Sequence, residues 1–405
     1  MPSPTSARAD EGPAGTGLLL PDERGAETPT LRRLSTLRRA EAWRLLRGHA
    51  QVGDRRVARA LADLARRAPD DAVSVLLDPI PAMFARLDRP QDAGDAWALE
   101  LARRGTALAP HRVQGRRLVS VRLGVSLTWP ADAHVTIHPG MLSIDGDRRA
   151  TRQVALDPEA LRAFDDPALT VTPAFVELAR GIRFGRVDPN PDAHLEAHPD
   201  KQGNAVSLGG QDPAAWTFAL EGALALIRRH LPIVVDEMAL SSFVLFPVGH
   251  DPVKHLSASY REYVGACYLT LHPNLPTMAE AMVHEFQHNK ANLASYHDAL
   301  LDNPAGTLVR SPVRPDPRPI WGVLLAVHAF VAVAELYRRM SASGDGSVRA
   351  RLGDVIARND EGLRTLRQHA RPTRIGAALL EELEGLHAEH LALALPGPAA
   401  AAWEG

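Results

Sequence analysis

The sequence has a single cysteine, Cys267, among its 405 residues, so no disulfide forms within the chain. So few cysteines are typical of a reducing compartment, which predicts a cytoplasmic protein. The longest apolar stretch, Ile320 to Ala334, is interrupted by His328 and falls short of the roughly 18 to 20 residues of a membrane span. We therefore expect a buried helix there and no membrane partner. Near the amino terminus, the apolar run Gly17 to Leu20 is too short for a signal peptide.

Neither sign of charge dominates the chain. Its 46 lysines and arginines and 48 aspartates and glutamates give a formal net charge of −2. Without an overall basic field, nucleic acid is not an expected partner, and a peptide or a small molecule fits better. The sequence also lacks a glycine-rich loop with nucleotide-binding spacing and any repeat with a period of roughly 20 to 50 residues. Nucleotide chemistry and repeat architectures are therefore disfavoured.

The composition, 45% hydrophobic and 23% charged, is that of a chain that buries a core. Residues 1–28, rich in Pro, Gly, Ala and charge, are predicted to be a disordered tail. Residues 29–108 have leucines spaced by three and four, which predicts a helical N-terminal region. Residues 109–405 are predicted to form a metal-binding catalytic domain of mixed α/β structure. The predicted fold class is thus α+β.

Periodicity within this second region changes along the chain. From Arg117 apolar residues alternate with polar or small ones, which predicts β-strands. A helical pattern follows over 213–230, and strands are predicted at 243–246 and 264–271.

The strongest chemical signal is the HExxH motif at 284–288. On a helix with about 100° per residue, His284 and His288 lie about 40° apart and one turn apart in height, so both imidazoles can bind one metal ion. Glu285 is rotated about 100° from His284. We therefore expect it not to be a ligand but to lie beside the open coordination position, as a catalytic acid or base.

The same pentapeptide also arises by chance, so its context matters. Thr277 and Glu280 have the spacing of a capping box, which predicts a helix start just before the motif. Apolar residues, among them Met282, Val283 and Phe286, occupy the other side of this helix. Both features favour a metal site over coincidence.

Two histidines do not complete a metal site, so a third ligand must come from elsewhere. The position at which a metzincin has its next histidine is Ala294, and no thermolysin-like continuation follows. His328, in the buried helix predicted at 320–334, is the first candidate. Glu335, two turns further along the same face, is the second, and His297 the third.

Three arginines lie in a proline-rich segment at 310–319, directly before the helix that carries His328. Prolines restrict the backbone, and Pro319 suits the first position of a helix. Arg318 and Arg314 are therefore candidates for bidentate binding of a carboxylate, whereas the alternative is a surface loop with solvated arginines.

The chain resembles the family of HEXXH-motif peptide-modification proteins, most closely from about Phe243 to Tyr337. The motifs that carry the likeness are His272-Pro273-Asn274-Leu275-Pro276, the HExxH segment with Asn289-Lys290-Ala291-Asn292, Arg314-Pro315-Asp316-Pro317-Arg318-Pro319 and Gly322-Val323-Leu324-Leu325.

Several expectations follow from this resemblance. It implies maturation of a ribosomally synthesised precursor peptide, in some cases with a radical-SAM partner. Some members are described as iron(II)- and 2-oxoglutarate-dependent hydroxylases of a side-chain β-carbon. The resemblance thus implies His284, His288 and His328 as the iron ligands, and Arg318 or Arg314 as the cation for the distal carboxylate. An all-histidine set is atypical of iron oxygenases, which keeps Glu335 open.

Three functions remain in competition. The first is the iron oxygenase, which we favour. The second is a zinc hydrolase in which Glu285 activates metal-bound water to cut a peptide. The third, a non-catalytic peptide-binding protein with a structural metal, is disfavoured because structural zinc sites usually have four protein ligands and prefer cysteine. The sequence does not identify the metal, the precursor peptide, the modified residue or the oligomeric state.

Overall fold

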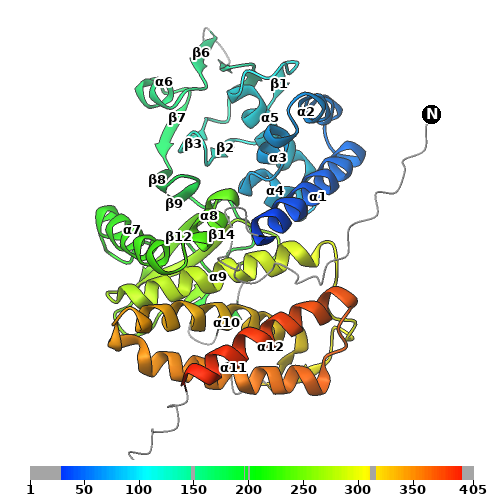
Figure 1. The fold of residues 1–405 in the computed structure, drawn as a ribbon. Helices are drawn as coiled ribbons and strands as arrows, with labels where there is room; N and C mark the ends of the chain where they lie inside the picture. The colour runs from blue at the N-terminus through cyan, green and yellow to red at the C-terminus, as the bar shows by residue number, and fades with distance from the viewer. Residues whose placement is uncertain (1–28, 147–150, 196, 199–200, 311–315, 395–405) are drawn as a thin grey trace, which may run out of the picture.

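The computed structural model of the protein describes residues 29–146, 151–195, 197–198, 201–310 and 316–394 (Figure 1). It is a mixed α/β structure with a helical N-terminal region, as the sequence predicts. The predicted tail at 1–28 and the candidate Arg314 lie outside the described residues.

The N-terminal region consists of five helices, and short breaks separate them. Proline occupies an early position in α3, α4 and α5, where its missing N–H costs no hydrogen bond. The Asp54 carboxylate caps α2 by accepting from the backbone N–H of Arg56. The bounds are α1 (Pro29–Val52), α2 (Arg55–Arg67), α3 (Pro69–Leu76), α4 (Pro79–Arg86) and α5 (Pro90–Arg103).

Two small antiparallel sheets and the short helix α6 (Pro158–Ala163) follow. One sheet contains β2 (Arg117–Ser120), β3 (Val125–Thr128) and β7 (Thr170–Pro173); the other contains β1 (His111–Arg112), β4 (Ala133–His138), β5 (Met141–Gly146) and β6 (Arg152–Ala155). One hydrophobic cluster joins these strands to α1–α5 and so includes residues on both sides of position 108. The predicted division at 108 remains a prediction.

A five-stranded sheet, in the order β13-β14-β12-β9-β8, supports the second half of the chain. Its central strand β12 is parallel to β14 and β9, and the edge strands are antiparallel to their neighbours. The predicted helix at 213–230 and the predicted strands at 243–246 and 264–271 are confirmed. The bounds are β8 (Phe175–Ala179), β9 (Ile182–Gly185), β12 (Val244–His250), β13 (Ser257–Ala258), β14 (Ala266–Leu271), α7 (Pro213–His230) and α8 (Pro232–Leu240).

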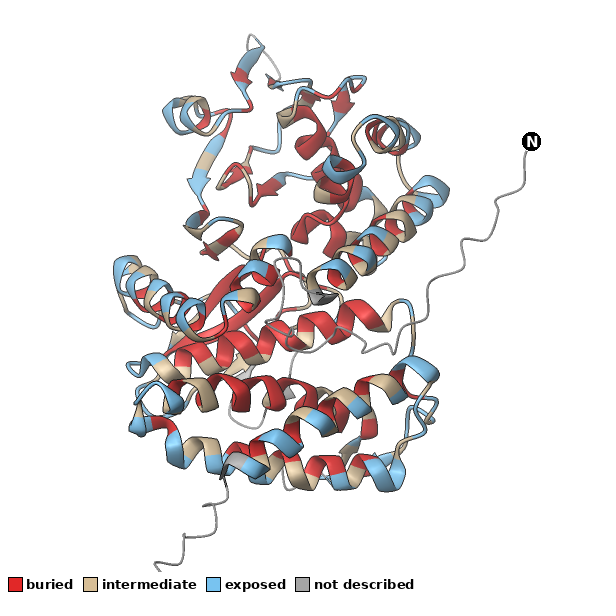
Figure 2. Cartoon of the chain, in the orientation of Figure 1, coloured by how far each residue is buried: buried red, intermediate tan, exposed pale blue. Residues whose placement is uncertain are grey.

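Helix α9 (Leu275–Ser295) packs on β14 and against α7 and α10 (Ile320–Ala342). The turn η1 (Gly346–Val348) and helices α11 (Arg349–His369) and α12 (Arg374–Ala394) complete the lower layer in Figure 1. Two two-stranded ribbons are formed by β10 (Ala197–His198) with β11 (Lys201–Gln202), and by β15 (Leu308–Val309) with β16 (Arg318–Pro319). Figure 2 shows α9 and α10 as predominantly buried helices.

Helix α10 confirms the buried helix expected from the apolar stretch at 320–334. At 23 residues it is long and apolar enough to span a membrane, but 78% of its most apolar window is buried inside the protein. Such burial is what the core helix of a soluble protein shows.

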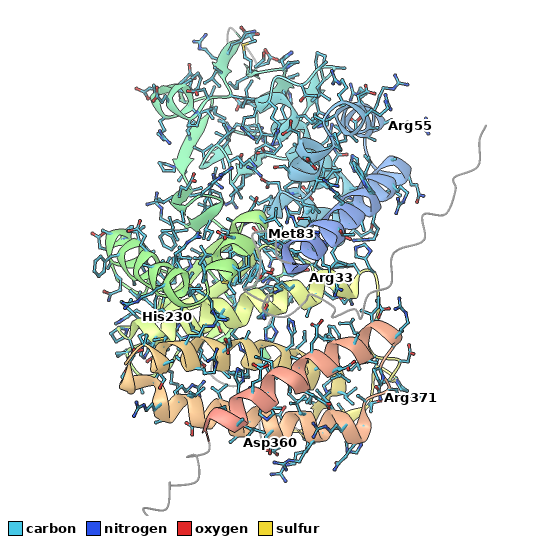
Figure 3. The ribbon with its side chains drawn as sticks, viewed as in Figure 1. Arg33, Arg55, Met83, His230, Asp360 and Arg371 are labelled. Carbon is cyan, nitrogen blue, oxygen red and sulfur yellow. The ribbon has the colours of Figure 1, made fainter. Side chains whose placement is uncertain are left out.

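The N-terminal helices and the five-stranded sheet meet in a shared apolar cluster. Met83 of α4, labelled in Figure 3, is fully buried there together with Phe246 of β12 and Tyr268 of β14. Arg55 and Arg371, also labelled, lie on the exposed periphery. The N-terminal helices therefore pack directly on the sheet that supports α9.

Candidate metal centre

The helix that carries the motif begins differently from the sequence prediction. Asn274 is its N-cap, because the Asn274 side chain accepts a hydrogen bond from the backbone N–H of Thr277 at 2.9 Å. The predicted capping box of Thr277 with Glu280 is therefore wrong. Glu280 instead accepts hydrogen bonds from Tyr337 and Arg351, two residues far along the chain.

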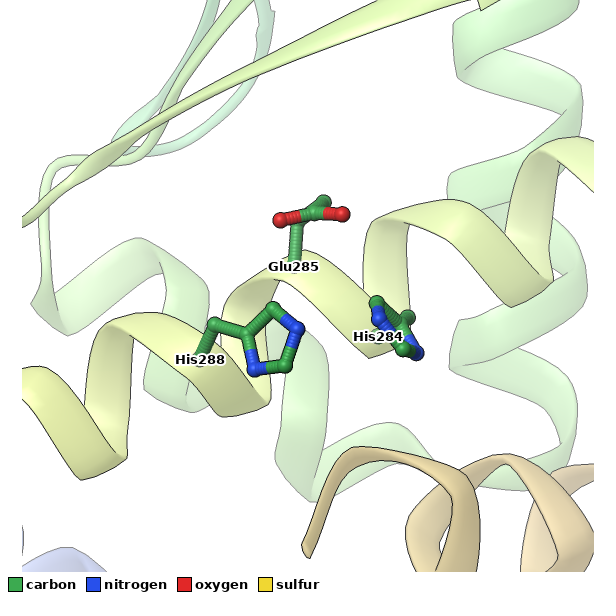
Figure 4. Close-up of side chains that lie close together, drawn as sticks. All are labelled: His284, Glu285 and His288. Atoms are coloured by element: carbon green, nitrogen blue, oxygen red, sulfur yellow. The ribbon is translucent and has the colours of Figure 1, made fainter. Parts of the chain in front are cut away.

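His284, Glu285 and His288 form the one group of potential metal ligands found among the described residues. Their ligand atoms lie within 4.8 Å of one another. The two imidazole rings have centroids 4.4 Å apart and planes at 80°. Figure 4 shows the Glu285 carboxylate directed away from the side of α9 on which the two rings lie. The helical geometry predicted for the histidine pair is thus present in the structure.

Hydrogen bonding in this group agrees with a role in metal binding. The Nδ1 atoms of His284 and His288 are buried and have no hydrogen-bond partner among the described residues. Buried polar atoms of this kind usually have a partner, and a bound ion would supply one here. The Glu285 carboxylate accepts a hydrogen bond from the Ser257 hydroxyl of β13 at 2.7 Å, which fixes its orientation.

Electrostatics keep both imidazoles neutral. Burial, followed by the neighbouring His288, lowers the pKa of His284 well below its usual value. Burial and then Arg318 lower the pKa of His288 to about 4. A neutral imidazole has a lone pair available for a metal, so at neutral pH both side chains are in the ligand form.

Among the candidate third ligands, His328 is the one whose charge affects the pKa of His284. It is fully buried in α10, and it contributes to the lowered pKa of His284. It does not belong to the group whose ligand atoms lie within 4.8 Å of one another. Its role as the third ligand stays a prediction.

The other two candidates have different partners. Burial would raise the pKa of Glu335, but hydrogen bonds from Arg338, His390 and Arg339 outweigh burial and hold it well below the usual range. The His297 imidazole lies 3.6 Å from the Glu41 carboxylate of α1. Neither belongs to the metal-ligand group, so the structure does not bring them to the motif.

Of the two candidate arginines, the structure describes only Arg318. It is half-buried at the start of β16, and its charge is one cause of the lowered pKa of His288. Its closeness to the motif was expected from the sequence.

A cavity of about 540 Å³ opens beside His284, and sequence reasoning missed most of its lining. The Phe330 ring of α10 forms one wall, 4.6 Å from the His284 ring. Glu280, Tyr337 and Arg351 line the same cavity. Of these, only Glu280 had a sequence signal, since it lies one helical turn before His284 on the same face.

No protein-family model matches the chain, and no curated protein sequence is significantly similar to it. The resemblance to HEXXH-motif peptide-modification proteins therefore stays a prediction from the motifs quoted above. The geometry itself defines a mixed α/β protein with two histidines and a glutamate grouped on one buried helix, next to a cavity.

Proposed function

We propose that the protein is a metal-dependent enzyme that modifies a ribosomally synthesised precursor peptide, by iron(II)- and 2-oxoglutarate-dependent hydroxylation of a side-chain β-carbon. The observation that carries metal dependence is the group of His284, Glu285 and His288, with two buried Nδ1 atoms that have no partner among the described residues. The choice of reaction is drawn from the resemblance and from the missing protease continuation after the motif.

His284 and His288 would hold the metal, with His328 as the proposed third ligand. Iron(II), when bound with the keto acid, supplies the activation of dioxygen. The chain's own contribution is to shape the surroundings. The cavity lies beside the helices α9 and α10, and Phe330 gives it an apolar wall next to His284.

Glu285 has a second proposed role beside the histidines. Its carboxylate is held by the Ser257 hydroxyl, close to the ligand atoms but on another side of the helix. Because its carboxylate lies within 4.8 Å of the histidine ligand atoms, we propose that it holds or moves a proton beside them. The same arrangement favours the second candidate function, a zinc hydrolase in which Glu285 is the general base.

The partners proposed with this function are a precursor peptide and a radical-SAM maturase, and the proposed location is the cytoplasm. These follow from the resemblance and from the low cysteine content.

Loading the protein anaerobically with iron(II) or with zinc, followed by turnover with 2-oxoglutarate and a candidate peptide, tests the proposal. We expect succinate formation and a peptide mass increase of one oxygen with iron only. Titration of 2-oxoglutarate against Arg318→Lys and Arg314→Lys tests the two cations suggested by the sequence, since lysine keeps the charge but loses the planar fork. Peptide cleavage with zinc and no keto acid would replace the oxygenase with the hydrolase.

A further inference from the structure

We propose that Arg351, rather than Arg318, binds the carboxylate of a small dicarboxylate in the cavity beside His284. The inference deepens the proposed function, since 2-oxoglutarate is such a dicarboxylate. It is drawn from the lining of the cavity, which includes Arg351 and His284 but not Arg318.

The cavity has a metal end and a polar end. At the metal end lie His284 of α9 and Phe330 of α10. At the polar end, Glu280 of α9 meets Tyr337 of α10, whose hydroxyl donates to the Glu280 carboxylate at 2.5 Å. The volume of about 540 Å³ is in the range of small-molecule sites. Both ends therefore belong to one continuous space of suitable size.

The spacing of Glu280 and His284 along α9 is comparable with the length of a five-carbon dicarboxylate. Glu280 and His284 are four residues apart on one face of α9, which is about 6 Å along the helix axis. Four carbon–carbon bonds of about 1.5 Å in a zigzag separate terminal carboxyl carbons by about 5 Å. A keto acid with one end at the metal would thus present its other carboxylate at the level of Glu280 and Arg351.

The Arg351 guanidinium is already held in place for such a ligand. Its Nε donates to Glu280 at 2.9 Å, and its Nη2 donates to the other Glu280 oxygen. Glu280 is the one carboxylate in ion-pair contact with Arg351 among the described residues, and the arginine side chain is 34% exposed. A guanidinium has five N–H donors, so the Nη1 edge can bind a second carboxylate. Glu280 therefore orients the guanidinium through Nε and Nη2 and leaves the Nη1 donors for a ligand.

The start of α11 lies at the polar end of the cavity. Arg351 is the third residue of this 21-residue helix, which follows η1 directly. Ser347 and Val348 line the cavity, so the positive end of the helix dipole lies there, and the Asp345 carboxylate partly offsets it by accepting from the Ser347 backbone N–H. Arg318, by contrast, does not line this cavity, and its charge acts on His288.

Calorimetric titration of the full-length, anaerobic iron(II)-loaded protein with 2-oxoglutarate and with succinate tests the inference. The variants are Arg351→Gln, Arg351→Lys and Arg318→Lys. Arg349→Gln is the matched control, because Arg349 is exposed on the same helix and lies outside the cavity lining. We expect the Kd of 2-oxoglutarate to rise at least tenfold in both Arg351 variants, with iron content and melting temperature close to wild type, and to stay unchanged in Arg349→Gln.

The outcomes separate this inference from the proposed function. Unchanged binding in Arg351→Gln, a rise in Kd confined to Arg318→Lys, or a wild-type protein that binds neither compound would each overturn the inference. If the wild type hydroxylates a peptide while Arg351→Gln keeps its affinity, the function stands and the inference fails. If 2-oxoglutarate binding depends on Arg351 but no hydroxylation occurs, the inference stands and the proposed reaction fails.

Discussion

A buried ion pair connects α9, the helix of the candidate metal centre, to α8. The Lys290 ammonium lies 3.0 Å from the Glu237 carboxylate, and the two side chains are 1% and 0% exposed. Replacing Lys290 with Met removes the positive charge and leaves the carboxylate buried. Because burial already raises the pKa of Glu237, we expect this carboxyl to take up a proton in the variant.

The free energy needed to protonate Glu237 sets the loss of folding stability in the variant. From the ordinary glutamate pKa of 4.5, neutralisation at pH 7 costs about 3.4 kcal/mol, at 1.36 kcal/mol per pH unit. At pH 5.5 the same step costs about 1.4 kcal/mol. The folded-state pKa in the variant is raised, so stability is retained at low pH and lost as pH rises. Glu237→Gln leaves a buried lysine and should show the opposite dependence on pH.

Urea unfolding at pH 5.5 and 7 measures both trends. Lys290→Met should lose roughly 3 kcal/mol at pH 7 and clearly less at pH 5.5, while the double variant Lys290→Met with Glu237→Gln should regain most of the loss. Asp70→Asn is the control, since the Asp70–Arg39 ion pair is exposed and should contribute less than about 1 kcal/mol. A loss independent of pH, or a double variant as unstable as the single one, would refute the reasoning.

Three further predictions concern the site and its surroundings. His284→Ala and His288→Ala should each lose bound metal in elemental analysis while the circular dichroism stays that of the wild type; full metal content in either would contradict the ligand assignment. Glu285→Gln should keep its metal and lose most turnover, because an amide cannot accept a proton, whereas loss of metal would make Glu285 a ligand. Burial raises the pKa of Asp188 from 3.8 to about 6, so its ionisation costs stability as pH rises through this interval, up to roughly 3 kcal/mol. Asp188→Asn should therefore stabilise the protein by about 1 kcal/mol more at pH 7.5 than at pH 5 in unfolding experiments, with the exposed Asp132→Asn as control, and equal effects at both pH values would contradict this.

The histidine pair could be predicted from the sequence because its geometry is local. Residues four apart on a helix lie one turn apart on one face, whatever packs around them. The placement of His284 and His288 therefore needed only a correct prediction of helix. The apolar pattern of α9 was enough for that, even though the expected capping residues were wrong and Asn274 forms the cap.

The polar end of the cavity could not be predicted in the same way. Glu280 bonds Tyr337 and Arg351, which follow it by 57 and 71 residues. Such contacts depend on how α9, α10 and α11 pack, and no periodicity in the sequence records that packing. The sequence therefore directed attention to Arg318, which is near in the chain to the expected third ligand, whereas the cavity beside His284 contains Arg351.

Helix α10 shows why residues on one helix face need not share a function. His328 and Glu335 are seven residues apart, so periodicity places them on one face, about 10 Å apart along the axis. That distance is enough for a different helix to pack over each of them. Glu335 meets His390 of α12 and two arginines of its own helix, which balance its buried charge. His328 instead influences His284 of α9. A polar residue in an apolar helix is therefore interpreted from the element that packs over its own turn: Glu335 contributes to the attachment of α12, whereas the charge of His328 acts on His284 of α9, so His328 stays the proposed third ligand.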